Sequence, residues 1–454
     1  MIGLYLKNYF SQMSKLKKIY WVFFVIYSPI ITICIIIWFF SLHGTVGTFQ
    51  TFIVYKLLVY IFIFCALIGP IMALFDMILS IISTTHHIPR RFVWLAFLFS
   101  LLIPVGFFGF TTISLSHPAG DKPPHLLLCD GTGKYGIPNL AVSFWTQQET
   151  KNILIWGNSS EIFIEEETSY KNSHVFLLND LKPDTSYWYQ INNVGENYTF
   201  TTPPATNDTI TFAVATDSHF GPFSRNIEGT INLLNLISDP SSGNDAFFFL
   251  GDFVDLGFDD YEWKLGLDTF SPFTSKIPFR PVIGNHESIL GGAQYFLDYF
   301  YPIGMTIQTG SRFWYRIDIN NIHFFLLDLE WGIEEYNHAQ KIWFEDQIKT
   351  IPKNDWTIFM CHCNFGQEMI DTFHSIFLQY DVDLVFSGHS HNYNLENRSG
   401  IIYTTVGVSG GTTIFDNWYD EMYCYMNVKI AGDTANLKYF NALNETIEEL
   451  NVTR

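Results

Sequence analysis

Five short polar motifs, each directly after an apolar run, constrain this chain more than any other feature of its sequence. The runs are rich in Val, Ile, Phe and Thr, which is typical of buried strands, and they cover Thr211–Thr216, Ala246–Leu250, Phe279–Ile283, Trp356–Cys361 and Leu384–Ser387. The motifs are Asp217-Ser218-His219, Gly251-Asp252-Phe253-Val254-Asp255, Gly284-Asn285-His286-Glu287, His362 and Gly388-His389-Ser390-His391. Because open α/β sheets gather their sites at the carboxyl ends of strands, we expect the motifs to meet at one rim.

The residue types in these motifs suit a centre of two divalent metal ions. Two ions about 3.5–4 Å apart need a bridging carboxylate, with imidazole and oxygen ligands on each ion. Asp252 is the expected bridge, since its motif opens straight out of a strand. His389 and His391 are two residues apart on a tight loop, so each can face a different ion. Polar residues that merely end strands would not account for five motifs in this order.

This constellation resembles the calcineurin-like metallophosphoesterase superfamily over about residues 208–440. The resemblance implies a first metal site made by Asp217, His219, Asp252 and His391. It implies a second metal site made by Asp252, Asn285, His362 and His389. His286 would be a catalytic residue that binds no metal and lies beside the leaving group or the phosphoryl oxygens. The implied cofactors are two divalent ions, of Mn, Fe or Zn.

Three long apolar stretches precede the motifs, at 19–42, 52–82 and 92–115, after a short segment at 1–18. Each exceeds the roughly 20 residues that a helix needs to cross a bilayer. Basic residues lie before the first stretch and between the second and third: Lys7, Lys15, Lys17, Lys18, Arg90 and Arg91. The sequence therefore predicts an integral, multi-pass membrane protein with the lipid bilayer as a partner. Its N-terminus would be cytoplasmic and its catalytic domain extracellular or lumenal.

The charge of the chain excludes one class of partner. Its 44 acidic against 25 basic residues give a net charge of −19, whereas nucleic acid binding needs a basic face. Six N-x-S/T acceptor sites follow the last apolar stretch, which predicts a glycoprotein in a eukaryotic host, at Asn158, Asn197, Asn207, Asn397, Asn444 and Asn451. Cys361 and Cys363 flank His362 and could be metal ligands. We favour a structural role, with a disulfide from one of them to Cys424 or Cys129.

The region before the motifs has its own pattern. Residues 116–124, with three prolines, read as a linker, and short alternating strands separated by turns fill 125–205. Val142-Ser143-Phe144-Trp145, Leu178–Tyr189 and the exit Phe200-Thr201-Thr202-Pro203-Pro204 resemble the fibronectin-like domain that precedes the catalytic domain of purple acid phosphatases. The expected fold class is thus a membrane-anchored α+β/α/β chain. It comprises three transmembrane helices, a fibronectin-like β-sandwich, a four-layer αββα metallophosphoesterase domain at 208–440 and a tail at 441–454.

Two positions depart from the purple acid phosphatase pattern, which has glycine where His219 stands and tyrosine where Asp255 stands. Exchanging an anionic phenolate for a neutral imidazole favours a divalent first metal over Fe(III). Asp255 would then either orient a histidine ligand through its other ring nitrogen or cap the following loop. His374 would be either a further donor to the substrate phosphate or an exposed helix residue.

The layout favours hydrolysis of phosphomonoesters, by attack of a hydroxide that bridges the two metals. Phosphodiesters linked to lipids or glycans are the alternative within the same chemistry. A non-catalytic metal-binding receptor or sensor domain is the alternative from another class. It is disfavoured because every ligand position holds a competent residue.

Overall fold

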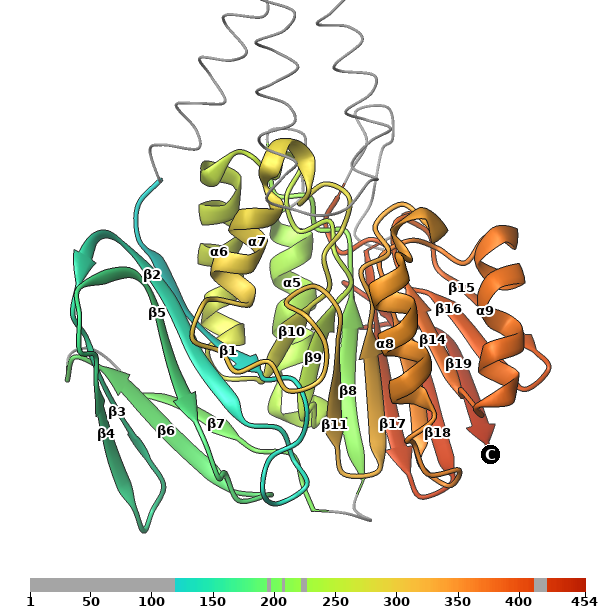
Figure 1. The fold of residues 1–454 in the computed structure, drawn as a ribbon, viewed down its shortest axis with the longest axis horizontal. Helices are drawn as coiled ribbons and strands as arrows, with labels where there is room; N and C mark the ends of the chain where they lie inside the picture. Colours follow the sequence, from blue (N-terminus) through green and yellow to red (C-terminus); the bar gives the residue numbers. More distant parts are fainter. Residues whose placement is uncertain (1–118, 194–196, 206–208, 222–226, 412–422) are drawn as a thin grey trace, which may run out of the picture. The chain divides into compact units, whose positions relative to one another are not determined.

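The computed structural model describes residues 119–193, 197–205, 209–221, 227–411 and 423–454, which belong to one compact unit (Figure 1). The described helices are α5 (Ile227–Ser238), α6 (Asp260–Thr274), α7 (Ala293–Phe300), α8 (His338–Ile348) and α9 (Gln367–Gln379). Three single 3₁₀ turns accompany them: η1 (Pro240–Ser242), η2 (Ile289–Gly291) and η3 (Ile333–Glu335). The strands form three sheets.

The largest sheet has nine strands in the order β19-β18-β17-β8-β9-β10-β1-β2-β5. In chain order they are β1 (Lys122–Leu128), β2 (Leu140–Thr150), β5 (Lys171–Leu178), β8 (Ile210–Ala215), β9 (Ala246–Phe249), β10 (Phe279–Pro281), β17 (Cys424–Ala431), β18 (Thr434–Asn441) and β19 (Thr446–Thr453). Its strands β8, β9 and β10 are parallel neighbours, with Ala215 opposite Phe249 and Phe249 opposite Pro281. This register brings the carboxyl ends of the three strands to one level.

The second sheet has six strands in the order β11-β12-β13-β14-β16-β15. They are β11 (Tyr315–Ile319), β12 (Ile322–Leu326), β13 (Trp356–Met360), β14 (Leu384–Ser387), β15 (Asn394–Arg398) and β16 (Ile401–Thr405). Its strands β13 and β14 are parallel, with Met360 opposite Phe386. The polar motifs after them therefore also open at one level.

Phenylalanines alternate between the two faces of these sheets, as the two-residue period of a strand requires. Phe248 of β9 stacks on Phe324 of β12 with 4.6 Å between ring centroids, so one face of each large sheet packs on the other. Its neighbour Phe249 turns the opposite way and meets Phe270 of α6 at 5.4 Å. On the far face of the second sheet, Phe359 of β13 contacts helix α9 through Phe377 at 4.9 Å. Helices thus lie on the outer face of each of the two packed sheets.

The third sheet, in the order β4-β3-β6-β7, is made by β3 (Ile153–Gly157), β4 (Ile162–Glu166), β6 (Ser186–Ile191) and β7 (Tyr198–Thr201). We expected the strands of 125–205 to stand apart from the catalytic region. Instead β1, β2 and β5 continue the nine-stranded sheet, because β1 pairs in parallel with β10 through Leu127 and Phe279. Strand β1 also begins inside the expected linker. Its two prolines fall where the register with β2 shifts, the position at which a strand tolerates a missing N–H.

The predicted membrane part of the fold class needs correction. In the part of the chain that the structure describes, no helix is long and apolar enough to cross a membrane. The longest, α6, has 15 residues, fewer than the roughly 20 that a bilayer requires. The stretches 19–42, 52–82 and 92–115 lie outside the described residues. The fold class is corrected to a mixed α/β fold. The three transmembrane helices, the bilayer as a partner and the multi-pass localisation with an extracellular or lumenal catalytic domain are not supported.

The predicted disulfide is also wrong for the described residues. Cys129, Cys361, Cys363 and Cys424 are all buried and free. Burial raises the pKa of the Cys424 thiol to about 12, which keeps it protonated and unreactive at neutral pH. These cysteines pack as small apolar side chains.

His125 of β1 gives the fold a dependence on pH. The ring is buried, its Nδ1 lies 2.6 Å from Thr274 Oγ1, and burial lowers the pKa of His125 to about 3. An unfolded histidine has a pKa of about 6.5. As pH falls from about 6.5 towards 3, His125 becomes protonated in the unfolded chain but stays neutral in the folded chain. The free energy of unfolding therefore decreases over that pH range.

We predict that His125→Leu removes this loss. Between pH 7 and pH 5 the wild type should lose up to about 2 kcal/mol more stability than the variant, because one pKa unit corresponds to about 1.4 kcal/mol. Urea unfolding at both pH values measures the difference. His338→Leu, at an exposed histidine of α8, is the matched control and should behave as the wild type. Equal pH dependence in wild type and His125→Leu would contradict the interpretation.

Candidate metal centre

The five predicted motifs meet at one rim formed by both large sheets. The loops after β8, β9 and β10 come from the first sheet, and those after β13 and β14 come from the second. Ligand-bearing residues of these loops adopt left-handed backbone conformations, with φ between 48° and 69°, at Asp217, His219, Asp252, His389 and His391. Asp and His tolerate this conformation better than most residues. Each such turn ends the strand abruptly and directs its side chain into the space above the sheet edges.

Gly251 shows why the Asp252 loop needs glycine. Its φ is +89°, and a Cβ there would lie 2.7 Å from the backbone of Gly284 and 2.8 Å from Nδ1 of His362. Only a residue without a side chain lets the loops after β9, β10 and β13 approach this closely.

The first cluster contains Asp217, His219 and His391, whose candidate ligand atoms lie within 4.8 Å of one another. The Nε2 atoms of His219 and His391 are 3.0 Å apart, and Asp217 Oδ1 is 3.3 Å from His391 Nε2. The other carboxylate oxygen of Asp217 accepts hydrogen bonds from Thr216 Oγ1 and from the backbone N–H of His389. These bonds leave Oδ1 directed at the two imidazoles.

The second cluster contains Asp252, His362 and His389, again within 4.8 Å. Asp252 Oδ2 is 3.2 Å from His362 Nε2 and 3.5 Å from His219 Nε2, so this carboxylate faces both clusters. Asn285 presents its side-chain oxygen 3.0 Å from His362 Nε2 and 2.9 Å from His389 Nδ1. The structure therefore brings together all seven predicted ligands, in the two groups expected from the sequence.

The chemistry of these atoms fits a pair of cations. Asp217 Oδ1 is fully buried and accepts no hydrogen bond from the described residues. In each cluster two imidazole nitrogens approach each other to 3.0–3.2 Å, with a carboxylate oxygen close by. Nitrogen lone pairs this close together can bind one shared cation. Mixed nitrogen and oxygen donors are the set that Zn²⁺, Mn²⁺ and Fe²⁺ accept. The prediction that the site can hold two metal ions is thus supported by the donor set, with Asp252 common to both sites.

Two of the ligand histidines, His219 and His362, hold protons when no cation is bound, because neighbouring carboxylates raise their pKa despite burial. Although burial lowers the pKa of His362, the Asp252 and Asp217 carboxylates raise it to about 9. Burial alone would raise the pKa of Asp217, but its contacts with His219 and His391 bring it well below its usual value. Metal ions must displace the histidine protons, so metal affinity should weaken as pH falls.

His286 lies beside both clusters but is held differently. Its Nδ1 is 2.7 Å from the backbone oxygen of Asp255, and its backbone N–H donates to Asp252 Oδ1 at 2.9 Å. Its Nε2 is 4.0 Å from Asp252 Oδ2, farther than the nitrogens of His219 and His362. The side chain is 32% exposed, so it can reach a bound substrate. The candidate ligand atoms of His286, His219 and Asp252 also lie within 4.8 Å of one another.

The two tentative residues fall in different places. Asp255 Oδ1 is 3.1 Å from His219 Nδ1, the ring nitrogen that faces away from the first cluster. This geometry is that of a carboxylate orienting a metal-binding histidine. His374, on α9, has its Nδ1 2.9 Å from the hydroxyl of Tyr403 and joins none of the clusters.

Glu287 positions the loops of the centre, a role that its place in the sequence motif did not predict. Its buried carboxylate accepts the backbone N–H groups of Asp252, Phe253, Val254 and Gly284, at 2.7–3.1 Å. The sequence does place this glutamate directly after Asn285 and His286, next to two predicted site residues. Three of its four hydrogen-bond donors lie in the Asp252 loop, however, and only the fold brings that loop close.

The acceptor sites for glycosylation stay predictions. Asn197, Asn397, Asn444 and Asn451 are exposed, Asn158 is partly buried, and Asn207 lies outside the described residues.

Comparison with known proteins agrees with this geometry. Residues 210–393 match the family described as Calcineurin-like phosphoesterase, which confirms the predicted resemblance over those residues. The chain is 25% identical over 263 residues to Purple acid phosphatase 1 of Ipomoea batatas, covering 51% of this chain and 54% of that protein. It is 27% identical over 260 residues to Phosphoenolpyruvate phosphatase of Allium cepa, covering 51% and 52%. The chain thus spans about half the length of these curated relatives.

A solved structure shares the fold. It is a purple acid phosphatase from yellow lupin (Lupinus luteus) seeds, with a TM-score of 0.59, 15% identity and coverage of 74% of both chains.

We predict that Asp252→Ala loses both metal ions, because Asp252 is the one predicted ligand that faces both clusters. Metal analysis of the purified, dialysed protein measures the stoichiometry. Asp255→Ala is the matched control: it removes the carboxylate that contacts His219 Nδ1, so affinity at the first site should fall by about 10–100-fold while the second site stays filled. An Asp252→Ala protein that retains two ions would refute the shared ligand.

Proposed function

We propose that this chain is a metal-dependent phosphoric ester hydrolase that prefers phosphomonoesters. The observation that carries the proposal is the pair of clusters sharing Asp252, with the partly exposed His286 next to them. Purple acid phosphatase and phosphoenolpyruvate phosphatase, the names of two relatives, are monoesterase names and support the preference. When bound, two divalent ions supply a hydroxide nucleophile near neutral pH and neutralise the charge of the phosphoryl group.

The first site should take a divalent ion. Asp255, the residue that stands in place of the phenolate of purple acid phosphatases, faces a histidine ring at 3.1 Å and is no member of the three candidate clusters. The first cluster then offers one or two carboxylates and neutral imidazoles, a set with too little anionic charge to favour Fe(III).

His286 is suited to act as a general acid. The Asp255 backbone oxygen can only accept, so the proton on Nδ1 is fixed there and Nε2 is the atom that exchanges protons with a substrate. Burial lowers the pKa of His286, so its second proton is held weakly and is given up readily to a leaving oxygen. The protonated fraction grows as pH falls, which favours turnover on the acid side of neutrality.

The competing class is a metal-binding domain without catalysis. Six of the seven predicted ligands belong to groups whose candidate ligand atoms lie within 4.8 Å of one another, and Asn285 presents its oxygen to two of those histidines. His286 packs on the ring of His219, yet its side chain stays 32% exposed. These observations favour an enzyme.

We predict that His286→Ala leaves two metals bound and lowers kcat by about 10²–10⁴, the range of general acid–base catalysis. The loss should be smaller for p-nitrophenyl phosphate, whose leaving group needs no proton, than for an alkyl phosphate. Steady-state kinetics of the Mn(II)-loaded chain on both substrates, with metal analysis of each variant, measure the effect.

Two further arms make the test decisive. The wild type should hydrolyse p-nitrophenyl phosphate faster than bis(p-nitrophenyl) phosphate, and the reverse order would replace the monoester by a diester. His374→Ala, away from the clusters, should retain wild-type kinetics. Metal loss in His286→Ala would show that His286 is a ligand, and equal losses on both monoesters would show that it is not the acid for the leaving group.

A further inference from the structure

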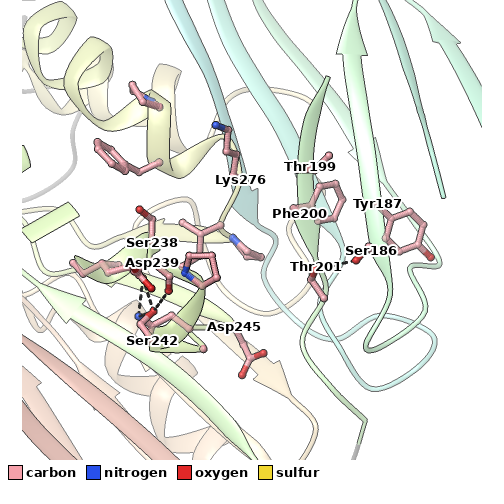
Figure 2. Close-up of a pocket in the computed structure, with 18 of the residues that line it drawn as sticks. Ser186, Tyr187, Thr199, Phe200, Thr201, Ser238, Asp239, Ser242, Asp245 and Lys276 are labelled. Atoms are coloured by element: carbon pink, nitrogen blue, oxygen red, sulfur yellow. Dashed lines mark hydrogen bonds between the residues drawn. The ribbon is translucent and has the colours of Figure 1, made fainter. Parts of the chain in front are cut away.

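A cleft of about 650 Å³ opens on the side of the molecule away from the metal centre (Figure 2). One wall is made by β6 and β7, and the other by the end of α5, the turn η1 and the end of α6. Asp245, which lines it, comes directly before β9, whereas Asp252 lies in the loop that follows β9. The cleft therefore lies at the opposite ends of the strands that carry the metal ligands. Its size falls in the range of about 300–1,000 Å³ that ligand sites occupy.

The strand β7 is an edge of its sheet, and its outer side faces this cleft. Opposite residues of β6 and β7 pair as Ser186 with Thr201 and Trp188 with Thr199. In the next pair along, the backbone N–H of Thr202 donates to the oxygen of Thr185. Residues of an antiparallel strand alternate between bonding the partner and facing away from it. Thr199 and Thr201 therefore turn their backbone N–H and C=O groups outward, towards the cleft.

Most of the features that usually protect an edge strand are missing from β7. Natural edge strands are protected by short length, charged residues, proline or bulges, or by a covering segment, and β7 has the short length, at four residues. The four residues of β7, Tyr-Thr-Phe-Thr, contain no charge and no proline, and the pairing with β6 shows no register shift. Within the described ranges, no backbone hydrogen bond reaches Thr199 or Thr201 from the far wall. The outward backbone groups of β7 are thus available to pair with another strand inside the cleft.

The far wall carries one cationic side chain. Lys276 lines the cleft and is exposed (Figure 2). Its backbone N–H donates to the oxygen of Phe273, but its ammonium group forms no ion pair or hydrogen bond with the described residues. The acids of the same wall are already engaged. Asp239 accepts from the backbone N–H and the hydroxyl of Ser241, and Asp245 accepts from the backbone N–H of Thr211 at 2.8 Å. Lys276 is the one cationic side chain among the lining residues with which an anionic group in the cleft could pair.

We propose that this cleft binds an extended peptide segment, which adds a strand to the edge of β7 and places an acidic side chain against Lys276. The main-chain bonds to Thr199 and Thr201 would give affinity, and alternate side chains of the peptide would lie on the partly buried Trp188 and Phe273. This activity is separate from the proposed hydrolysis, because no ligand of the metal centre lines the cleft.

The test uses a pool of blocked seven-residue peptides that alternate Thr with Val, Ile or Tyr and carry Asp at the centre. Titration calorimetry on the full chain should detect binding, and hydrogen exchange should show new protection over residues 198–202. N-methylation of the peptide at alternate residues removes its main-chain donors and should weaken binding by at least about tenfold. Replacement of the central Asp by Asn should weaken it about fivefold, and Lys276→Ala should abolish that difference.

Two protein variants locate the site. Thr201→Pro removes an outward N–H that bonds nothing in the ladder, so the fold should survive while binding falls at least about tenfold. Ile164→Pro is the matched control on β4, the other edge of the same sheet, where Ile164 also faces outward. It should bind as the wild type, with thermal unfolding reporting that both variants are folded. Absence of binding at millimolar peptide, insensitivity to N-methylation, or loss only in Ile164→Pro would overturn the proposal.

Discussion

The carboxylate of Glu287 is the contact on which the arrangement of the metal centre depends. It accepts four backbone N–H groups, three from the Asp252 loop and one from Gly284 at the start of its own loop. Hydrogen bonds to a charged group contribute about 1.5–3 kcal/mol each, whereas an unpaired buried charge costs several. Burial and the charge of Asp252 raise the pKa of Glu287 to about 7, whereas the backbone N–H donors of Val254 and Gly284 oppose this rise by stabilising the charged carboxylate. The loops after β9 and β10 are thereby fixed to each other.

From this fixed pair the rest of the centre follows. Asp252 is anchored through its backbone to Glu287 and through Oδ1 to the N–H of His286, which leaves Oδ2 directed between the clusters. The second sheet contributes His362, whose Nδ1 lies 2.6 Å from the Leu250 oxygen and so leaves Nε2 for the cluster. The left-handed turns at the strand ends cost free energy, as strained backbones at functional sites commonly do. Packing of the two phenylalanine-rich sheet faces holds them in place.

Sequence patterns predicted the parts of this centre that depend on strand ends. The run Leu384–Ser387 was predicted to the residue, and the other four runs were right to within one or two residues, because buried parallel strands read as short apolar blocks. The pairing of β1 with β10 was not predictable, since it depends on a contact between Leu127 and Phe279, far apart in the chain, and the prolines of β1 resembled a linker. Residues 441–454 were predicted to be a tail, whereas strand β19 (Thr446–Thr453), whose residues are all exposed or half-buried, lies there. The role of Glu287 escaped for the same reason as β1: its partners are backbone atoms of another loop.

The central claim is that Asp252 joins two metal sites built from both sheets. A crystal structure of the Mn(II)-loaded chain, with anomalous scattering to locate the ions, tests it most directly. The account predicts two peaks about 3.5–4 Å apart, both bound by the Asp252 carboxylate, one with His219 and the other with His362. A single peak, or two ions that share no ligand, would contradict it.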